Sequence, residues 1–363
     1  MEFIKKTINL QLFGAGEAVH STEGFVNTKD ASKNEAYVET PGKESGLSAE
    51  MKTFYDKTLI ELAGPSLVYD QFAQKRPIPA GGGKSIEFRK FNALPKALTP
   101  ITEGVTPTAS KLTVVPVTAT VDQYGDYVEL TDMIELTSVD PIVVEATKQL
   151  ADQAGRTIDT VVRNQIMGGT NVNYCPLVGS DGTETEITSR KNITPECVLR
   201  VKDVFRAAAQ LKAMNAPTID GSYVAVIHPY VAFDLMQDAK GQWLDIQKYA
   251  DPQNILKGEI GTLGGVRFVQ SSEAKIYTGD EGGKDGAAVF CTLFIGANAY
   301  GSTDIAGGGI EHIVKQKGYG NDPLNQRSSV GWKATKVATR LVEEYMVRVE
   351  SGSSFSSSVI EAN

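Results

Sequence analysis

The sequence predicts an α+β fold from three observations. A long stretch with helical periodicity begins at Pro141 and continues to Gly168. Two strand-like segments lie within residues 78–130, joined by a tip rich in proline and threonine. The remaining helices and strands are mixed without the regular strand–helix rhythm of a doubly wound parallel sheet.

The composition is that of a globular protein that does not grip nucleic acid. At 363 residues, with 41% hydrophobic and 22% charged residues, the chain is long enough for one large or two smaller domains. There are 36 Lys and Arg against 44 Asp and Glu, which gives a formal net charge of −8. Proteins that bind nucleic acid tightly usually show a basic total or a basic patch. Tight DNA binding is therefore disfavoured, whereas loose enclosure of DNA is compatible with this charge.

The cysteines and the apolar runs indicate the compartment. Cys175, Cys197 and Cys291 are far apart and odd in number, so we expect a reducing compartment and no disulfide framework. No run approaches the roughly 18 apolar residues of a membrane span. Polar residues also interrupt the apolar ones near the N-terminus, so we predict neither an export signal nor membrane association.

The N-terminal region predicts an arm followed by a helix. Residues 1–48 contain few core-forming side chains and many glycines, which is typical of a flexible arm. Ser48 is a plausible N-cap for a helix that runs to about Leu62, and Gly64-Pro65 ends it.

Residues 78–130 predict a long extended hairpin. Ile86 and Phe88 alternate with charged residues, and residues 112–128 bring the chain back as strand. Because a long isolated hairpin is marginally stable in water, it needs a surface to lie on. Long loops in compact domains are usually functional or bound to a partner.

The following segment predicts a strut-like helix. Asp140 is a plausible N-cap, and Pro141 occupies the first helical position, where proline is favoured. Apolar residues from Ile142 to Ile166 form one stripe, and Gly168-Gly169 ends it. At about 1.5 Å per residue, this helix spans about 40 Å.

The second half of the chain predicts alternating short elements and a closing strand. In chain order they are a loop over 171–189, a helix from Thr194 to about 217, a strand over 223–227, a short helix after Pro229, and strands over 266–269 and 288–295.

The chain from Lys317 to Glu350 predicts a turn and a strand without catalytic groups. From Tyr345 the side chains alternate, so Tyr345, Val347 and Val349 share one face of a half-buried strand. We expect Trp332 to be a buried anchor.

A search for chemical motifs yields no catalytic, cofactor-binding or metal-binding residue. Gly83-Lys84-Ser85 matches the end of a phosphate-binding loop, but Ile78 stands where its first glycine is needed. The chain before this fragment is broken by prolines, and the chain after it alternates as strand, so a nucleotide-using enzyme is only a remote alternative.

The titratable residues likewise indicate neither a catalytic site nor a metal site. His228 is expected to cap or pack, His312 to be an exposed strand residue, and no histidine pair has metal-ligand spacing. Glu343 and Glu344 are adjacent, so on a strand they would point to opposite faces and form a poor acid–base pair.

Several segments resemble the major capsid proteins of tailed bacteriophages of the coliphage N-four-like family. They are GNDPLNQR at 320–327, VGWKA at 330–334, YMVRVE at 345–350 and LGGVRFV at 263–269. The opening INLQLF at 8–13 is similar to starts common in phage capsid proteins of Gram-positive hosts. The similarity runs from about residue 50 to 350, and the order and spacing of the segments make it specific.

This resemblance implies a Hong-Kong-97-type capsid fold with an N-terminal arm, an extended loop, a long spine helix, and peripheral and axial domains. The implied divisions are 1–48, arm; 49–77, helix leading into the loop; 78–130, extended loop; 131–194, spine helix and peripheral domain; 195–315, axial domain; 316–352, return to the peripheral domain; and 353–363, C-terminal tail.

The resemblance also implies a function without catalysis or cofactors. The chain would self-assemble, as hexamers and pentamers, into the icosahedral shell of a tailed double-stranded DNA bacteriophage. Its implied partners are further copies of itself, portal and scaffolding proteins, possible decoration proteins, and enclosed DNA without sequence-specific binding. The shell would assemble in the bacterial cytoplasm and become part of the virion. An encapsulin-like cellular compartment shell is the alternative.

Overall fold

The computed structural model describes residues 67–356 apart from 80, 92–93, 95, 99, 102, 105, 107–108, 139–140, 180, 240–243, 246–257, 304–308 and 321. The predicted arm, the predicted helix over 48–62 and Asp140 therefore lie outside the described residues. The chain forms two compact units. Among the segments with described residues, unit 1 contains Gly125–Ala154 and Ile310–Lys333, and unit 2 contains Pro65–Tyr124, Gly155–Gly309 and Ala334–Asn363.

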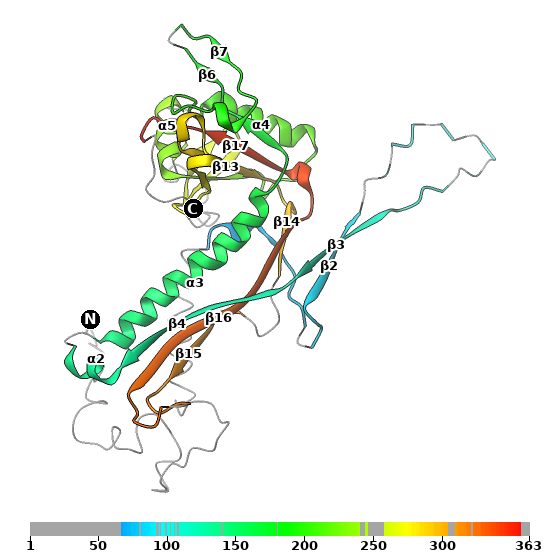
Figure 1. The fold of residues 1–363 in the computed structure, drawn as a ribbon. Helices are drawn as coiled ribbons and strands as arrows, with labels where there is room; N and C mark the ends of the chain where they lie inside the picture. The colour runs from blue at the N-terminus through cyan, green and yellow to red at the C-terminus, as the bar shows by residue number, and fades with distance from the viewer. Residues whose placement is uncertain are drawn as a thin grey trace, which may run out of the picture. The chain divides into compact units, whose positions relative to one another are not determined.

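Unit 2 is built on an eight-stranded mixed sheet with the order β5–β17–β13–β8–β11–β10–β9, in which β12 also pairs with β13 (Figure 1). Its strands are β5 (Val172–Tyr174), β8 (Tyr223–Ile227), β9 (Leu244–Asp245), β10 (Glu259–Leu263), β11 (Val266–Gln270), β12 (Ile276–Tyr277), β13 (Val289–Ile295) and β17 (Met346–Ser351). The strands predicted over 223–227, 266–269 and 288–295 are confirmed. Every residue of β8 and β13 is buried, because both faces of the sheet are covered.

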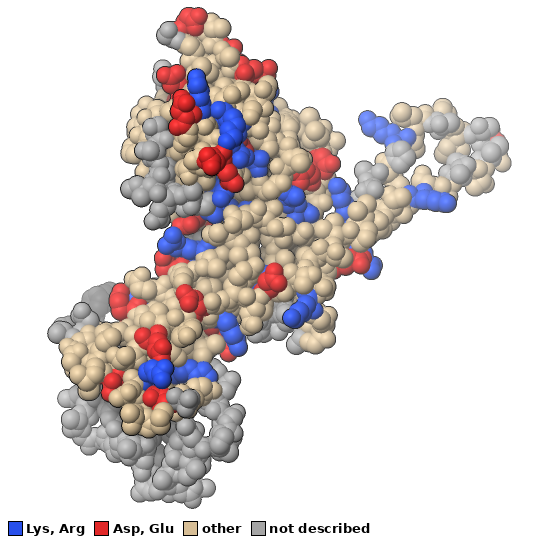
Figure 2. Space-filling model, viewed as in Figure 1, with Lys and Arg blue, Asp and Glu red and all other residues tan. Residues whose placement is uncertain are grey.

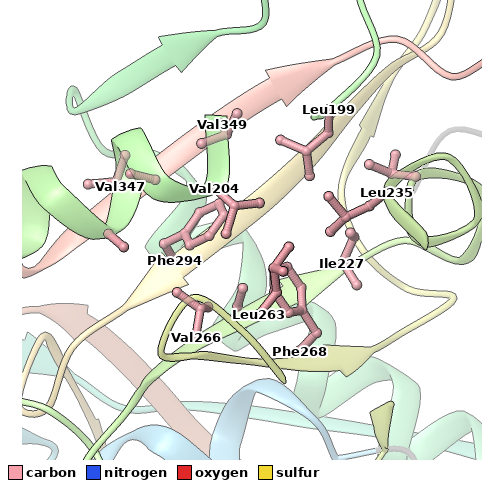
Figure 3. Close-up of a cluster of buried hydrophobic side chains, with 14 of the residues drawn as sticks. Leu199, Val204, Ile227, Leu235, Leu263, Val266, Phe268, Phe294, Val347 and Val349 are labelled. Atoms are coloured by element: carbon pink, nitrogen blue, oxygen red, sulfur yellow. The ribbon is translucent and has the colours of Figure 1, made fainter. Parts of the chain in front are cut away.

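Successive residues of β8 serve two different cores, one on each side of the sheet. Ala225 and Ile227 pack with residues of helices α4 (Val201–Ala213) and α5 (Pro229–Ala239) (Figure 3). Val224 and Val226 face the opposite core, which contains the C-terminal half of helix α3 (Ile142–Met167). This alternation follows from the period of two in a strand.

Helix α4 begins seven residues later than predicted. Pro195 lies in a turn in which the hydroxyl of Thr194 is 3.3 Å from the thiol of Cys197, and Val198 pairs with Gly352. The helix starts at Val201, because the Asp203 carboxylate accepts the backbone N–H of Arg200. The short helix predicted after Pro229 is confirmed as α5.

Strand β17 differs from the predicted half-buried strand, because both of its faces are buried. Val347 and Val349 share one face as predicted, but the opposite face is buried too, and Glu350 is fully inaccessible. The burial arises because β17 lies inside the sheet, antiparallel to β13 and parallel to β5. Tyr345 belongs to the short 3₁₀ helix η10 (Glu343–Tyr345), so Glu343 and Glu344 are not strand residues.

Helix α3 is the predicted strut. It has 26 residues, which gives a length of about 39 Å. Leu150, Ala154, Ile158, Val162 and Ile166 form its buried stripe.

The predicted hairpin is present as β2 (Ser85–Phe91) and β3 (Val114–Thr120). They pair antiparallel from Ser85 with Thr120 to Phe91 with Val114. The returning strand predicted over 112–128 is two strands, because after β3 the chain continues as β4 (Asp122–Thr131), which pairs with β16 (Arg327–Arg340). The loop predicted over 171–189 contains β5 and the two-stranded sheet of β6 (Leu177–Val178) and β7 (Glu184–Thr185).

Within unit 1, β16 lies between β4 and β15 (Glu311–Lys315), and the short helix α2 (Asp132–Thr137) follows β4. Neither β16 nor α2 was predicted. Within unit 2, the last residues of β16 pair with β14 (Tyr300–Thr303), which also pairs with β1 (Gln74–Lys75). The prediction that His312 is exposed is wrong: it is 3% exposed, because β15 pairs with β16 and His312 lies opposite Trp332.

Candidate assembly surfaces

The base of the β2–β3 hairpin is fixed by one buried aromatic residue. Phe88 is buried and packs against Gly301 of β14. A Cβ added at Gly301 would lie 2.7 Å from Cε1 of Phe88, so this strand approaches closely only because residue 301 is a glycine. Strand β14 therefore holds the base of the hairpin within unit 2.

Beyond this base, the described part of the hairpin exposes apolar side chains. Leu98 and Ile101 are 82% and 76% exposed, and the other exposed members are Leu94, Leu112, Val114 and Val115. Figure 1 shows the two strands extending together as a long ribbon. Several large exposed apolar side chains in one segment of a soluble protein favour an interaction site. We call these six residues the hairpin surface.

A second apolar surface lies in unit 1. Helix α2 buries none of its residues, and Met133, Ile134 and Leu136 are exposed. It is joined to the β15–β16 connection, because the backbone N–H of Asp132 donates to the Gln326 carbonyl at 3.0 Å. The connection adds the exposed side chain of Leu324. We call Met133, Ile134, Leu136 and Leu324 the α2 surface.

The β15–β16 connection has a defined shape. Gly318 and Gly320 have positive φ angles of 83° and 78°, which glycine adopts readily. The carboxylate of Asp322 accepts the backbone N–H groups of Arg327 at 2.9 Å and Gly318 at 3.3 Å. The hydrogen bond from the Arg327 backbone is the main cause that lowers the pKa of Asp322, so the carboxylate stays ionised and holds both ends of the connection.

Trp332 anchors β16 to helix α3 within unit 1, as predicted. Its ring is 3% exposed, and its indole N–H donates to the side-chain carbonyl of Gln153 at 3.1 Å. The backbone of Gly125 on β4 lies against the Trp332 carbonyl, and a Cβ at residue 125 would be 2.5 Å from that oxygen. The three elements therefore meet at Trp332.

The fragment Gly83-Lys84-Ser85 is not a phosphate-binding loop. Ser85 begins strand β2, whereas the motif requires a helix after the lysine. His228 is buried, and its Nδ1 accepts the backbone N–H of Tyr230, so it caps and packs as predicted. Burial lowers the pKa of both His228 and His312 to about 4, so both are neutral near pH 7.

Within the described ranges, no cluster of three or more His, Cys, Asp or Glu side chains could hold a metal ion. No helix in the same part of the chain is both long and apolar enough to cross a membrane.

Comparison with known proteins identifies the class. The family model described as "Phage capsid protein" matches residues 114–349, which is more than half of the chain. The chain therefore belongs to this family of phage capsid proteins. A search of curated protein sequences finds no match.

Solved capsid structures share the fold at low sequence identity. The capsid of Ralstonia phage GP4 is similar with a TM-score of 0.62 and 14% identity, over 80% of this chain and 89% of that chain. The capsid of cyanophage Pam1 is similar with a TM-score of 0.57 and 13% identity, over 91% and 99% of the two chains. The capsid of cyanophage P-SCSP1u has a TM-score of 0.56 and 15% identity, over 79% and 89%. The predicted α+β fold of the Hong-Kong-97 type is confirmed, and the chain is a phage capsid shell protein.

Proposed function

We propose that this chain is the major capsid protein of a tailed double-stranded DNA phage and assembles, as hexamers and pentamers, into an icosahedral head. The single observation that carries the proposal is the exposure of large apolar side chains on the hairpin surface. Such side chains are unfavourable in water, and burial against a neighbouring copy would remove them from it.

Charge supports the same contact. Residues 81–120, which include the hairpin, contain five Lys and Arg and two Glu, although the whole chain has a net charge of −8. Residues 122–152 contain eight Asp and Glu and one Lys. Figure 2 shows basic side chains spaced along the hairpin. Opposite charges on two surfaces favour their encounter and fix their orientation. The hairpin of one copy is thus suited to a neighbour's acidic segment.

The division into domains is part of the proposal. Residues 78–121 would form the extended loop, α3 the spine helix, and unit 1 the peripheral domain. The axial domain would contain residues 195–315, as the resemblance implies. Strand β17 would join it, because β17 pairs with β13; residues 316–352 would therefore not all return to the peripheral domain. The arm (1–48) would contact a further copy, whereas the tail (353–363) begins at Ser353, which is buried and hydrogen-bonds to Asp234 of the same chain.

The shell would enclose DNA without gripping it, since the chain is acidic overall. Portal and scaffolding proteins, with decoration proteins as optional partners, would complete the head in the host cytoplasm before the shell becomes part of the virion. The role would be structural, without catalysis. Nucleotide turnover that is abolished by Lys84→Ala would contradict this and favour an enzyme.

Electron microscopy of the purified protein tests the proposal. We expect closed shells for the wild type and none for the double variant Leu98→Ser/Ile101→Ser, because its apolar contacts with the neighbour are lost. Met214→Ser is the matched control: Met214 is also exposed but lies on unit 2 just after α4, away from the hairpin, so shells should form.

Two outcomes would change the conclusion. A wild-type protein that stays monomeric under every assembly condition would refute shell formation. Particles from the native source that enclose a protein cargo in place of DNA would favour the encapsulin-like compartment.

A further inference from the structure

One buried carboxyl group holds the segment where the described chain begins. Asp159 lies on α3 and is fully inaccessible to solvent. One of its oxygens accepts the backbone N–H of Tyr69 at 2.7 Å, and the backbone N–H groups of Val68 and Asp70 lie near it. A single side chain of α3 thus holds the backbone at the first residue of the 3₁₀ helix η4 (Tyr69–Phe72).

The carboxyl group is not neutralised by a cation. Within the described residues, its second oxygen has no hydrogen-bond partner. Arg163, one turn further along α3, directs its guanidinium group to the Asn164 side chain and the Glu273 backbone carbonyl. An ionised carboxylate in this position is therefore buried without a counter-charge, which is costly.

The neighbouring Asp70 is arranged in the opposite way. Its carboxylate is 2.8 Å from the Lys336 ammonium and 2.9 Å from that of Lys75, and it accepts a hydrogen bond from the Ser302 hydroxyl at 2.7 Å. Burial acts to raise its pKa, but Lys336 and these hydrogen bonds lower the pKa of Asp70 to about 2. Asp70 is thus held ionised, and Asp159 is the group whose charge can change.

The segment that Asp159 holds is a junction. Val68, Tyr69 and Phe72 are buried in the core between α3 and the sheet, and the Tyr300 hydroxyl donates to the Tyr69 carbonyl. Residues 1–66 precede this segment, and β1 and the hairpin follow it. Release of residues 68–72 would detach the segment that connects residues 1–66 to β1 and the hairpin.

We propose that the carboxyl group of Asp159 is a proton-dependent latch that fastens residues 68–72 to helix α3. In the protonated state the segment is docked firmly, because no charge is buried. In the ionised state docking is weaker, because the carboxylate regains hydration only when the segment opens. The latch goes beyond the proposed function. It is a property of the single subunit, so its test does not depend on shell formation.

The electrostatic surroundings agree with this assignment. The titratable and charged groups around the carboxyl group are Asp70 and Tyr69 on the docked segment, Arg163 on α3, Glu273, Cys291 on β13, Tyr300 on β14, and Lys75 and Lys336, which pair with Asp70. Burial is the largest influence on Asp159 and raises its pKa from 3.8 to about 7, against the lowering effect of the three backbone N–H groups. Since the docked state binds the proton more tightly than the open state, docking weakens as the pH rises from about 4 to about 7 and then levels off.

Hydrogen–deuterium exchange of the full-length, unassembled protein between pH 5 and 9 measures the latch. Rates for peptides that cover residues 67–73 are corrected for the intrinsic pH dependence of amide exchange. With a pKa of about 7 docked and 3.8 open, the opening constant should rise about 50-fold from pH 5 to 7 and only about twofold from pH 7 to 9. Asp159→Asn, which cannot ionise, should abolish this rise. Asp152→Asn is the matched control, since Asp152 is an exposed residue of the same helix, and it should keep the rise.

The proposal is overturned by a wild-type opening constant that is flat between pH 5 and 7, or by an equal rise in Asp159→Asn. A rise of the same size in peptides of β13 would show global unfolding and would also overturn it. If Asp159→Asn does not fold, the wild type alone provides the test. Its opening constant must rise between pH 5 and 7 in peptides of residues 67–73 and must not rise equally in peptides of β13.

Discussion

The buried carboxylate of Glu350 predicts a large stability loss on removal of its partner. Glu350 lies on β17, between β5 and β13 of the eight-stranded sheet, and its side chain is fully inaccessible. Arg190, in the 3₁₀ helix η5 (Arg190–Asn192), donates two hydrogen bonds to it, from Nε and Nη2, both at 2.7 Å. Arg348 is also close, with Nε 2.9 Å from Oε1, but without hydrogen-bond geometry. Arg190 therefore supplies the hydrogen bonds that compensate for burial of the charge.

Arg190→Met should reduce the free energy of unfolding by about 3 kcal/mol, since the buried carboxylate loses both of its hydrogen bonds from Arg190 and keeps only Arg348 as a nearby cation. We take the lower end of the usual range because Arg190 is 24% exposed. The variant also loses the contact of the guanidinium with the Tyr277 ring, 3.4 Å from its centroid. Urea unfolding of the unassembled subunit should show a midpoint lowered by about 1 M or slightly less.

An exposed ion pair in the same unit provides the control. Lys202 pairs with Glu184 at 2.6 Å, but the two side chains are 70% and 42% exposed. Lys202→Met should therefore change stability by at most about 1 kcal/mol. Equal losses in the two variants would refute the reasoning, because burial would then not determine the cost.

Three further predictions concern β16 and its neighbours. Trp332→Ala should destabilise the subunit by about 3–5 kcal/mol and lower the yield of shells counted by electron microscopy; unchanged shells would refute the anchor role. Asp70→Asn should cost about 2 kcal/mol at pH 7, from the lowering of the Asp70 pKa from 3.8 to about 2. In the wild type this contribution should disappear as the pH falls from about 4 to about 2, so acid unfolding curves of the two proteins should converge. Gly125→Ala should cost about 1–3 kcal/mol, since its Cβ would force β4 and β16 apart, and a thermal midpoint equal to that of the wild type would contradict this.

Elements with a strong local signal could be predicted from the sequence. Helix α3 has an apolar stripe, a proline at its start and two glycines at its end, and β13 is an apolar run interrupted only by Thr292. Strand β16 could not be predicted, because its buried positions include small residues and a lysine. Lys336 is buried only because the distant Asp70 pairs with it.

The candidate surfaces were predictable to different degrees. The hairpin was predicted, since strand alternation and a proline-rich tip are local features. The α2 surface was not, although Thr131 caps the helix by accepting the backbone N–H of Ile134. Exposure of α2 depends on where the rest of unit 1 packs. The burial of His312 also depends on packing that the local sequence does not show. It was predicted to be exposed, but the pairing of β15 with β16 buries it.

The position of β17 affects how the protein is made. Residues 346–351 are synthesised after every other described strand of this sheet, yet they lie between β5 and β13, inside the sheet. A nascent chain that lacks them leaves two strands with unpaired edges, and such edges promote aggregation. Closure of this sheet joins segments 176 residues apart (348 − 172), as in the pairing of Val172 with Arg348, so it is a slow, non-local step. During synthesis this sheet therefore stays incomplete until β17 has left the ribosome, so a subunit cannot assemble with its sheet closed before that point.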